Sequence, residues 1–185
     1  MKIYLTMEVS VRRREYIDLI LNNISDSFDI YHNYWFKDRK FVVYAYNYDK
    51  KNKFDTAKDA KLWDSKSYEH LFFINCDNLD PEKFKELYQF IIDSIEPHFV
   101  RADKRWPQKN HMCSYISFII ITKNPITYEV SQLIKKSNFK KNYLFGARGF
   151  SNVRIAVITP SSKEVTVNKY GAKIGNFLTE LLPNE

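Results

Sequence analysis

Few residues of this 185-residue chain have the types and spacing that catalysis requires. His111 and Cys113 are two residues apart, just before a predicted strand, so if the strand extended over them both side chains would leave the same face. Such a pair could begin a metal site or hold a reactive thiol. Only His98 and Asp103 are near in sequence as further ligands. We therefore predict no metal site and assign no catalytic residue.

A second set of residues invites comparison with nucleases of the PD-(D/E)XK type. Those enzymes hold Mg²⁺ with carboxylates on adjacent strands and place a lysine near the attacking water. Glu69 lies on a predicted strand, and Leu71 stands where the motif has lysine. The preceding acid would be Asp29 or Asp38, with Glu15 on the first predicted helix. A metal-dependent nuclease-like enzyme, active or inactive, is therefore an alternative function rather than the preferred one.

Glycine positions exclude the common nucleotide-binding loops from most of the chain. Those loops need glycine where backbone N–H groups approach a phosphate. The 4 glycines all lie in the last 40 residues, so residues 1–145 cannot hold a P-loop or a dinucleotide fingerprint. Gly146 and Gly149 have the GxxG spacing of a KH-type clamp, but they join two predicted strands rather than two helices. We interpret them as a plain turn.

Positive charge is concentrated in one part of the sequence. Residues 101–154 hold 11 Lys or Arg against 2 acids, whereas the whole chain has a net charge of only +7. Aromatic residues alternate with these cations near residue 143, and rings beside cations suit nucleic acid, whose phosphates and bases they contact. We predict a non-enzymatic module with a basic face that binds nucleic acid or another polyanion. A lysine-rich solvated face and a protein partner are the other interpretations. The candidate binding residues are Arg101, Lys104, Arg105, Lys109, Lys135, Lys136, Lys140, Lys141, Arg148 and Arg154.

Hydrophobic periodicity predicts the elements that position these residues. Helices are expected from Ser10 to Ser25, from Pro81 until Pro97 ends the helix, from Pro125 to Ser137, and from Ala172 to Leu182. Strands are expected at 28–36, 40–48, 68–76, 114–122, 141–145, 153–159 and 164–168, with one helical turn at 58–63. The strand at 114–122 contains the apolar run Ile116 to Ile121 and is apolar on both faces, so we expect it in the middle of the sheet. The order αβββαβαβββα predicts an α+β fold with a mixed β-sheet and helices packed on it.

Length and composition place this fold in one domain over residues 1–185, with a subdomain break, if one exists, in the 99–111 loop. Two cysteines cannot form a disulfide framework, and no apolar run is long enough for a membrane span. We expect a cytoplasmic protein without an obligate cofactor and without a membrane partner.

Several motifs resemble one family of small cytoplasmic proteins. They are His111-Met112-x-Ser114, Ile134-Lys135-Lys136, Lys141-x-Tyr143-x-Phe145-Gly146-x-Arg148-Gly149, Asn168-Lys169-x-Gly171, Lys61-x-Trp63 and Tyr68-Glu69-His70. Together they resemble an uncharacterised family from low-GC Gram-positive bacteria, known mainly as a domain of unknown function. The resemblance covers most of residues 28–182 and departs from the family at Phe150, where tryptophan is expected. It implies no activity, cofactor or catalytic residue.

Overall fold

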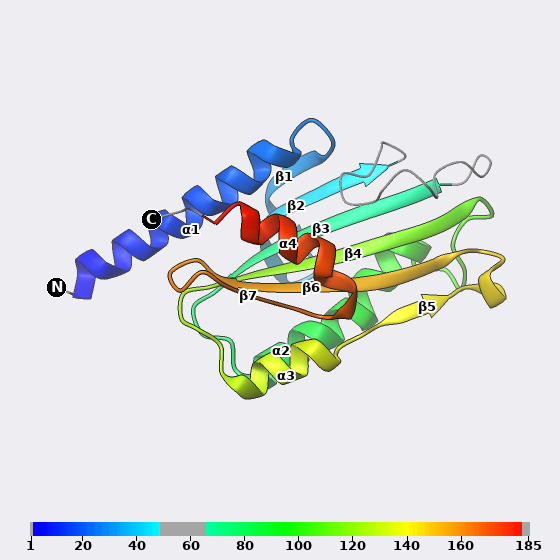
Figure 1. Cartoon of the computed structure of the whole chain (residues 1–185). Helices are drawn as coiled ribbons and strands as arrows, with labels where there is room; N and C mark the ends of the chain where they lie inside the picture. Colours follow the sequence, from blue (N-terminus) through cyan, green and yellow to red (C-terminus); the bar gives the residue numbers. More distant parts are fainter. Residues whose placement is uncertain (1, 49–65, 183–185) are drawn as a thin grey trace.

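The computed structural model describes residues 2–48 and 66–182, and the predicted helical turn at 58–63 lies outside these ranges. Its centre is a 7-stranded mixed sheet in the order β1-β2-β3-β4-β6-β5, with β7 paired to β6 (Figure 1). Strand β3 runs parallel to β4, and β4 runs parallel to β6, whereas the other neighbours are antiparallel. The strands are β1 Asp29–Phe36, β2 Arg39–Tyr48, β3 Lys66–Cys76, β4 His111–Thr122, β5 Lys140–Asn142, β6 Phe150–Thr159 and β7 Glu164–Val167.

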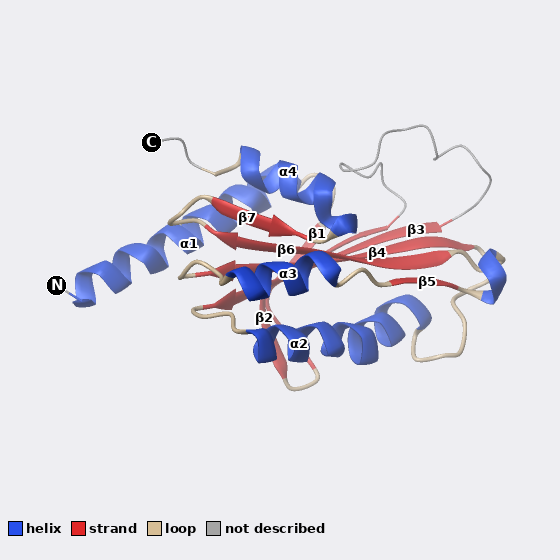
Figure 2. Cartoon of the chain, turned by 60° about the horizontal axis from the view of Figure 1, so that its bottom comes forward, coloured by secondary structure: helices blue, strands red, loops and turns tan. Residues whose placement is uncertain are grey.

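Helices cover both faces of the sheet (Figures 1 and 2). Helices α1 (Lys2–Ile24) and α4 (Ala172–Glu180) bury Ile20 and Leu178 against one face. Helix α2 (Pro81–Phe90), the π-helix η1 (Ile91–Val100) and α3 (Tyr128–Lys136) cover the other face. Each face of the sheet therefore has its own apolar core. For this reason strands β3, β4 and β6 carry apolar side chains on both faces. The predicted α+β class and element order are confirmed.

Strand β4 is the central strand that the apolar run Ile116 to Ile121 predicted. It pairs with β3 on one side and with β6 on the other, and Ile116, Phe118 and Ile119 are buried. The β3–β4 pairing also joins the residues before and after the 99–111 loop in one sheet. Among residues 2–48 and 66–182, none of the helices combines the length and apolarity needed to cross a membrane.

Three predicted helix boundaries are wrong. Helix α1 begins at Lys2, so Ser10 lies inside the helix and does not cap it. Pro97 does not end the second helix, because the chain continues as η1 and Pro97 lies within it. The wider π-helical turn moves the preceding carbonyls away from the proline ring that would break an α-helix. Helix α3 begins at Tyr128 rather than at Pro125, and it is capped by Thr127, whose hydroxyl accepts from the Val130 N–H at 3.4 Å.

The predicted strand at 141–145 is also wrong in its second half. Strand β5 ends at Asn142, and residues Leu144–Gly146 form a 3₁₀ turn, η2. Tyr143 is fully buried while Phe145 is fully exposed, so these two rings do not share a face. A short edge strand pairs over three positions only, and the turn that follows it sets the side-chain directions.

Candidate anion-binding pocket

A pocket of about 470 Å³ lies where the end of η1 and the following loop meet the starts of β3 and β4. Four cationic residues line it: Arg101, Lys104, Arg105 and Arg148. The aromatic residues Tyr68, Phe99 and Trp106 line it as well, together with His111. Within the described residues its lining contains no aspartate or glutamate. The pocket therefore combines positive charge with ring surfaces.

Arg101 is held at the edge of the pocket by Glu96. Its Nε donates to Glu96 Oε1 at 3.0 Å and its Nη2 donates to Oε2 at 3.0 Å, which is a bidentate pair. Its Nη1 donates to the backbone carbonyl of Lys104 at 2.6 Å. The hydrogen bond to Glu96 raises the pKa of Arg101, so its charge is permanent. The guanidinium is thus fixed before any ligand arrives.

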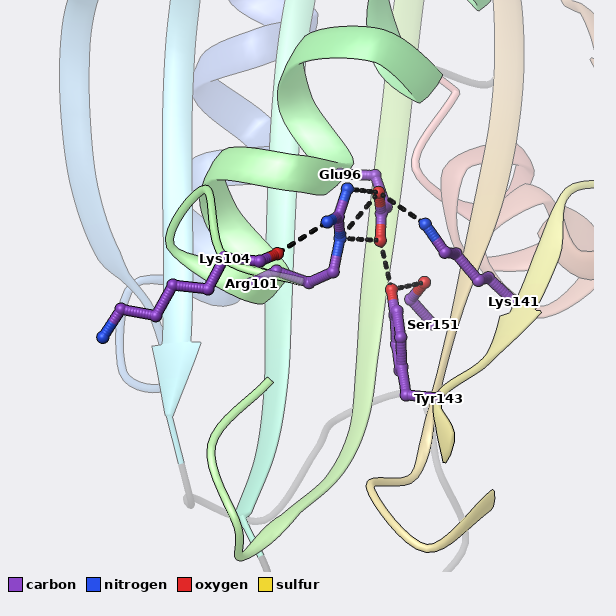
Figure 3. A network of polar contacts seen from close by, with 6 residues as sticks. All are labelled: Glu96, Arg101, Lys104, Lys141, Tyr143 and Ser151. Atoms are coloured by element: carbon purple, nitrogen blue, oxygen red, sulfur yellow. Dashed lines mark hydrogen bonds and ion pairs between the residues drawn. The ribbon is translucent and has the colours of Figure 1, made fainter. Parts of the chain in front are cut away.

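Glu96 is itself the centre of a buried polar network (Figure 3). Only 1% of Glu96 is exposed, and the ammonium of Lys141 lies 3.5 Å from Oε2. Figure 3 shows Arg101 and Lys141 approaching the carboxylate from opposite sides, with Tyr143 below it. The Tyr143 hydroxyl donates to Glu96 and lies 2.6 Å from Ser151 Oγ. Burial, and then the bond to Glu96, raise the pKa of Tyr143, which therefore stays protonated.

This network connects three elements. Glu96 comes from η1, Tyr143 follows β5, and Ser151 belongs to β6. A buried carboxylate without partners is strongly destabilising, so this side chain constrains the positions of all the groups that bind it. Sequence analysis did not identify Glu96. Its burial could have been predicted, because Glu96 stands four residues after Ile92 and therefore lies on the apolar face of the predicted helix.

His111 and Arg148 fix the opposite side of the pocket. The carbonyl of Arg148 lies 2.8 Å from His111 Nδ1 and can only accept, so Nδ1 carries the proton. The other nitrogen, Nε2, lies 2.8 Å from Ser114 Oγ and accepts from it in the neutral ring. Arg148 Nη1 donates to the carbonyl of Pro107 at 2.7 Å. Burial lowers the pKa of His111, and both ring nitrogens are engaged, so this histidine holds the pocket together rather than offering a free base.

His111 and Cys113 lie on β4 but do not share a face, as they would on a regular strand. His111 contacts Ser114 and stacks on Tyr68, with ring centroids 5.9 Å apart. Cys113 Sγ instead donates to Ser67 Oγ at 3.3 Å. The reason is an irregularity at the start of β4. Lys66 of β3 pairs with His111, and the next residue of β3, Ser67, pairs with Cys113, so Met112 is an extra residue. Because of this extra residue, the side chains of His111 and Cys113 leave opposite faces of the sheet, although they are two residues apart.

The ten predicted polyanion-binding residues fall into four groups. Arg101, Lys104, Arg105 and Arg148 line the pocket. Lys141 contacts Glu96 and does not line the pocket. Arg154 is buried and ion-paired with Glu69 at 2.9 Å. The remaining four, Lys109, Lys135, Lys136 and Lys140, are exposed outside the pocket lining.

The structure separates the carboxylates considered for a nuclease-like site. Glu69 is buried beside Arg154, whose guanidinium lies over the Tyr115 ring at 3.8 Å from its centroid. Asp29 is the first residue of β1, and Asp38 lies in the turn between β1 and β2. Glu15 is exposed on α1. Across residues 2–48 and 66–182 no group of three or more His, Cys, Asp or Glu could hold a metal ion.

Comparison with known proteins defines the family. The family model for the domain of unknown function DUF8052 matches residues 12–180, which is most of the chain. The chain belongs to this family. The predicted resemblance to an uncharacterised family is thereby confirmed. No curated protein matches the DUF8052 chain, and no solved structure matches it.

Proposed function

We propose that the protein is a non-enzymatic module that binds single-stranded nucleic acid at the basic and aromatic pocket. The observation that carries the proposal is the convergence of Lys104, Arg105 and Arg148 on one pocket with the rings of Tyr68 and Trp106. Phosphates bind cations, and unpaired bases stack on aromatic side chains. A pocket of about 470 Å³ is in the size range that holds a nucleotide-sized group.

The local charge supports an anionic ligand. Arg101 and Glu96 offset each other, whereas Lys104 is exposed and Arg105 lies with its guanidinium 5.1 Å from the centroid of the Trp106 ring. A nuclease-like role has less support, because Glu69 already forms an ion pair with Arg154. The proposed setting is the bacterial cytoplasm, where the two buried free cysteines stay reduced.

Charge reversal in the pocket tests the proposal. Lys104→Glu with Arg105→Glu should weaken binding of a labelled single-stranded oligonucleotide at least tenfold, because two phosphate contacts become repulsive. Fluorescence anisotropy at low salt measures the change. The matched control is Lys83→Glu with Lys85→Glu on α2, which changes the net charge equally but outside the pocket lining. Equal losses in the two double variants would show that only overall charge matters, and the pocket would not be the site.

A further inference from the structure

The turn between β5 and β6 presents an aromatic side chain to solvent. Phe145 is fully exposed, and its neighbour Leu144 is 40% exposed. A fully exposed phenylalanine gains nothing from burial in the folded chain, so packing does not explain its presence. The same turn supplies Arg148 to the pocket, three residues further along the chain.

The backbone of this turn is held in an unfavourable conformation. Leu144 and Phe145 have φ values of 50° and 54°, a region that bulky side chains rarely adopt. Hydrogen bonds close the turn: the N–H groups of Gly146 and Arg148 donate to the carbonyl of Tyr143 at 3.0 and 3.1 Å. The Tyr143 N–H in turn donates to the Gly149 carbonyl at 2.9 Å. Conformations of this kind persist only where the surroundings determine them, and they concentrate at binding sites.

The buried network around Glu96 fixes the start of the turn at Tyr143. Tyr143 is fully buried, and its hydroxyl is fixed by Glu96 and Ser151 (Figure 3). His111 holds the other end of the turn through the Arg148 carbonyl. Phe145 is therefore presented by a rigid support, which lowers the entropy that a ligand contact must overcome.

The charge around the turn selects the kind of ligand. Residues 130–154 contain six cations and no acid, and three of these cations, Lys140, Lys141 and Arg148, lie within five residues of Phe145 in the sequence. An exposed ring in a cation-rich segment suits a partner that is anionic and also has flat apolar groups. Single-stranded nucleic acid meets both requirements, because phosphates alternate with bases that have a π face.

We infer that Phe145 stacks on an unpaired base of a strand whose phosphates bind the pocket cations. The inference rests on the proposed function, since it assigns a base-stacking residue outside the pocket lining to the strand that the pocket binds. An anionic membrane surface also combines charge with an apolar layer. The pocket rings Tyr68 and Trp106 favour the nucleic acid, because they offer further stacking surfaces beside the same cations.

Three substitutions of Phe145 separate stacking from simple apolar contact. Because the side chain is fully exposed, the variants should fold normally. Binding of a labelled oligoadenylate should weaken about tenfold in Phe145→Ala and Phe145→Leu, and it should be retained in Phe145→Trp. Inorganic polyphosphate has no bases, so its binding should be the same in all four proteins. Tyr128→Ala is the control, because Tyr128 is 80% exposed at the start of α3.

Each other outcome overturns the inference in a distinguishable way. If the wild-type chain binds oligoadenylate and the pocket double variant weakens it while Phe145→Ala does not, the proposed function stands and the stacking role fails. Full binding by Phe145→Leu, or an equal loss for polyphosphate, rejects stacking as well. If no oligonucleotide binds, both proposals fail. Loss of binding to phosphatidylserine vesicles alone in Phe145→Ala would assign the turn to a membrane instead.

Discussion

At the scale of single residues, His70 shows how burial determines protonation. The side chain is 3% exposed on β3, and its Nδ1 lies 2.9 Å from the Tyr44 hydroxyl. Its Nε2 has no hydrogen-bond partner within the described part of the chain. Burial, with the neighbouring His111 as a smaller cause, lowers the pKa of His70 from 6.5 to about 3. The folded protein therefore keeps this ring neutral.

This pKa makes stability depend on pH. Below pH 6.5 the unfolded chain binds a proton at His70, whereas the folded chain binds it only near pH 3. The contribution of His70 to the free energy of unfolding is therefore highest above pH 6.5 and decreases as the pH falls toward 3. Between pH 7.5 and 5.5 the wild-type chain should lose about 1 kcal/mol more unfolding free energy than His70→Phe. Urea unfolding at three pH values measures this difference.

The control for this experiment is His32→Phe, since His32 is exposed on β1. This variant should keep the pH dependence of the wild-type protein. Parallel stability curves for the wild type and His70→Phe would contradict the buried neutral histidine. The variant also removes the contact with Tyr44, which shifts its whole curve by a pH-independent amount, so the test is the difference in slope between the two curves.

At the scale of elements, two glycines give the β5–β6 turn its shape for different reasons. Gly149 has a φ of +71°, and a Cβ there would lie 2.0 Å from the Met112 carbonyl oxygen on β4. Gly146 has a φ of +93°, but a Cβ there would meet no atom within 4 Å. The first glycine is needed for close approach of two backbones, and the second only for its conformation.

Alanine substitutions should separate these two roles. Gly149→Ala must move a backbone segment and should cost about 2–4 kcal/mol of unfolding free energy. Gly146→Ala adds only the cost of a left-handed alanine, about 1 kcal/mol. Chemical denaturation of the two variants compares them directly. Similar losses would mean that the contact between Gly149 and β4 is not maintained in solution.

At the scale of the whole molecule, the structure divides the positive charge that the sequence places in residues 101–154. Some cations line the pocket, some are neutralised in the interior, and others are exposed outside the lining. Arg154 illustrates the second group, and Arg101 lines the pocket but is also paired with a buried glutamate. The number of cations that can contact an anionic ligand is therefore smaller than the number of basic residues in this segment.

The salt dependence of binding should reveal this difference. Contacts from Lys104, Arg105 and Arg148 alone give a slope of log K against log salt of about −2, at about −0.7 per phosphate. If Lys109, Lys135, Lys136 and Lys140 also contact the strand, the slope becomes about −5. We expect the shallower value from anisotropy titrations at several salt concentrations. A slope near −5 would instead assign binding to the whole basic face.

The amino-acid sequence by itself determined the class of fold and the identity of the central strand. Apolar periodicity in α2 and the apolar run Ile116 to Ile121 are local patterns, and burial follows directly from them. The 11 cations of residues 101–154 were equally visible, and the prediction of a polyanion ligand was made from them. Local patterns of this kind need no knowledge of distant contacts.

Only the tertiary structure decided which charges line the pocket and which form ion pairs in the interior. Glu96 is 45 residues from Lys141 in sequence, and Glu69 is 85 residues from Arg154, so no local pattern indicates these pairs. The irregular start of β4 turned His111 away from Cys113, and the 3₁₀ turn after β5 separated Tyr143 from Phe145. Long-range electrostatics and backbone irregularities depend on how the elements are packed, and packing is settled only when the whole chain folds.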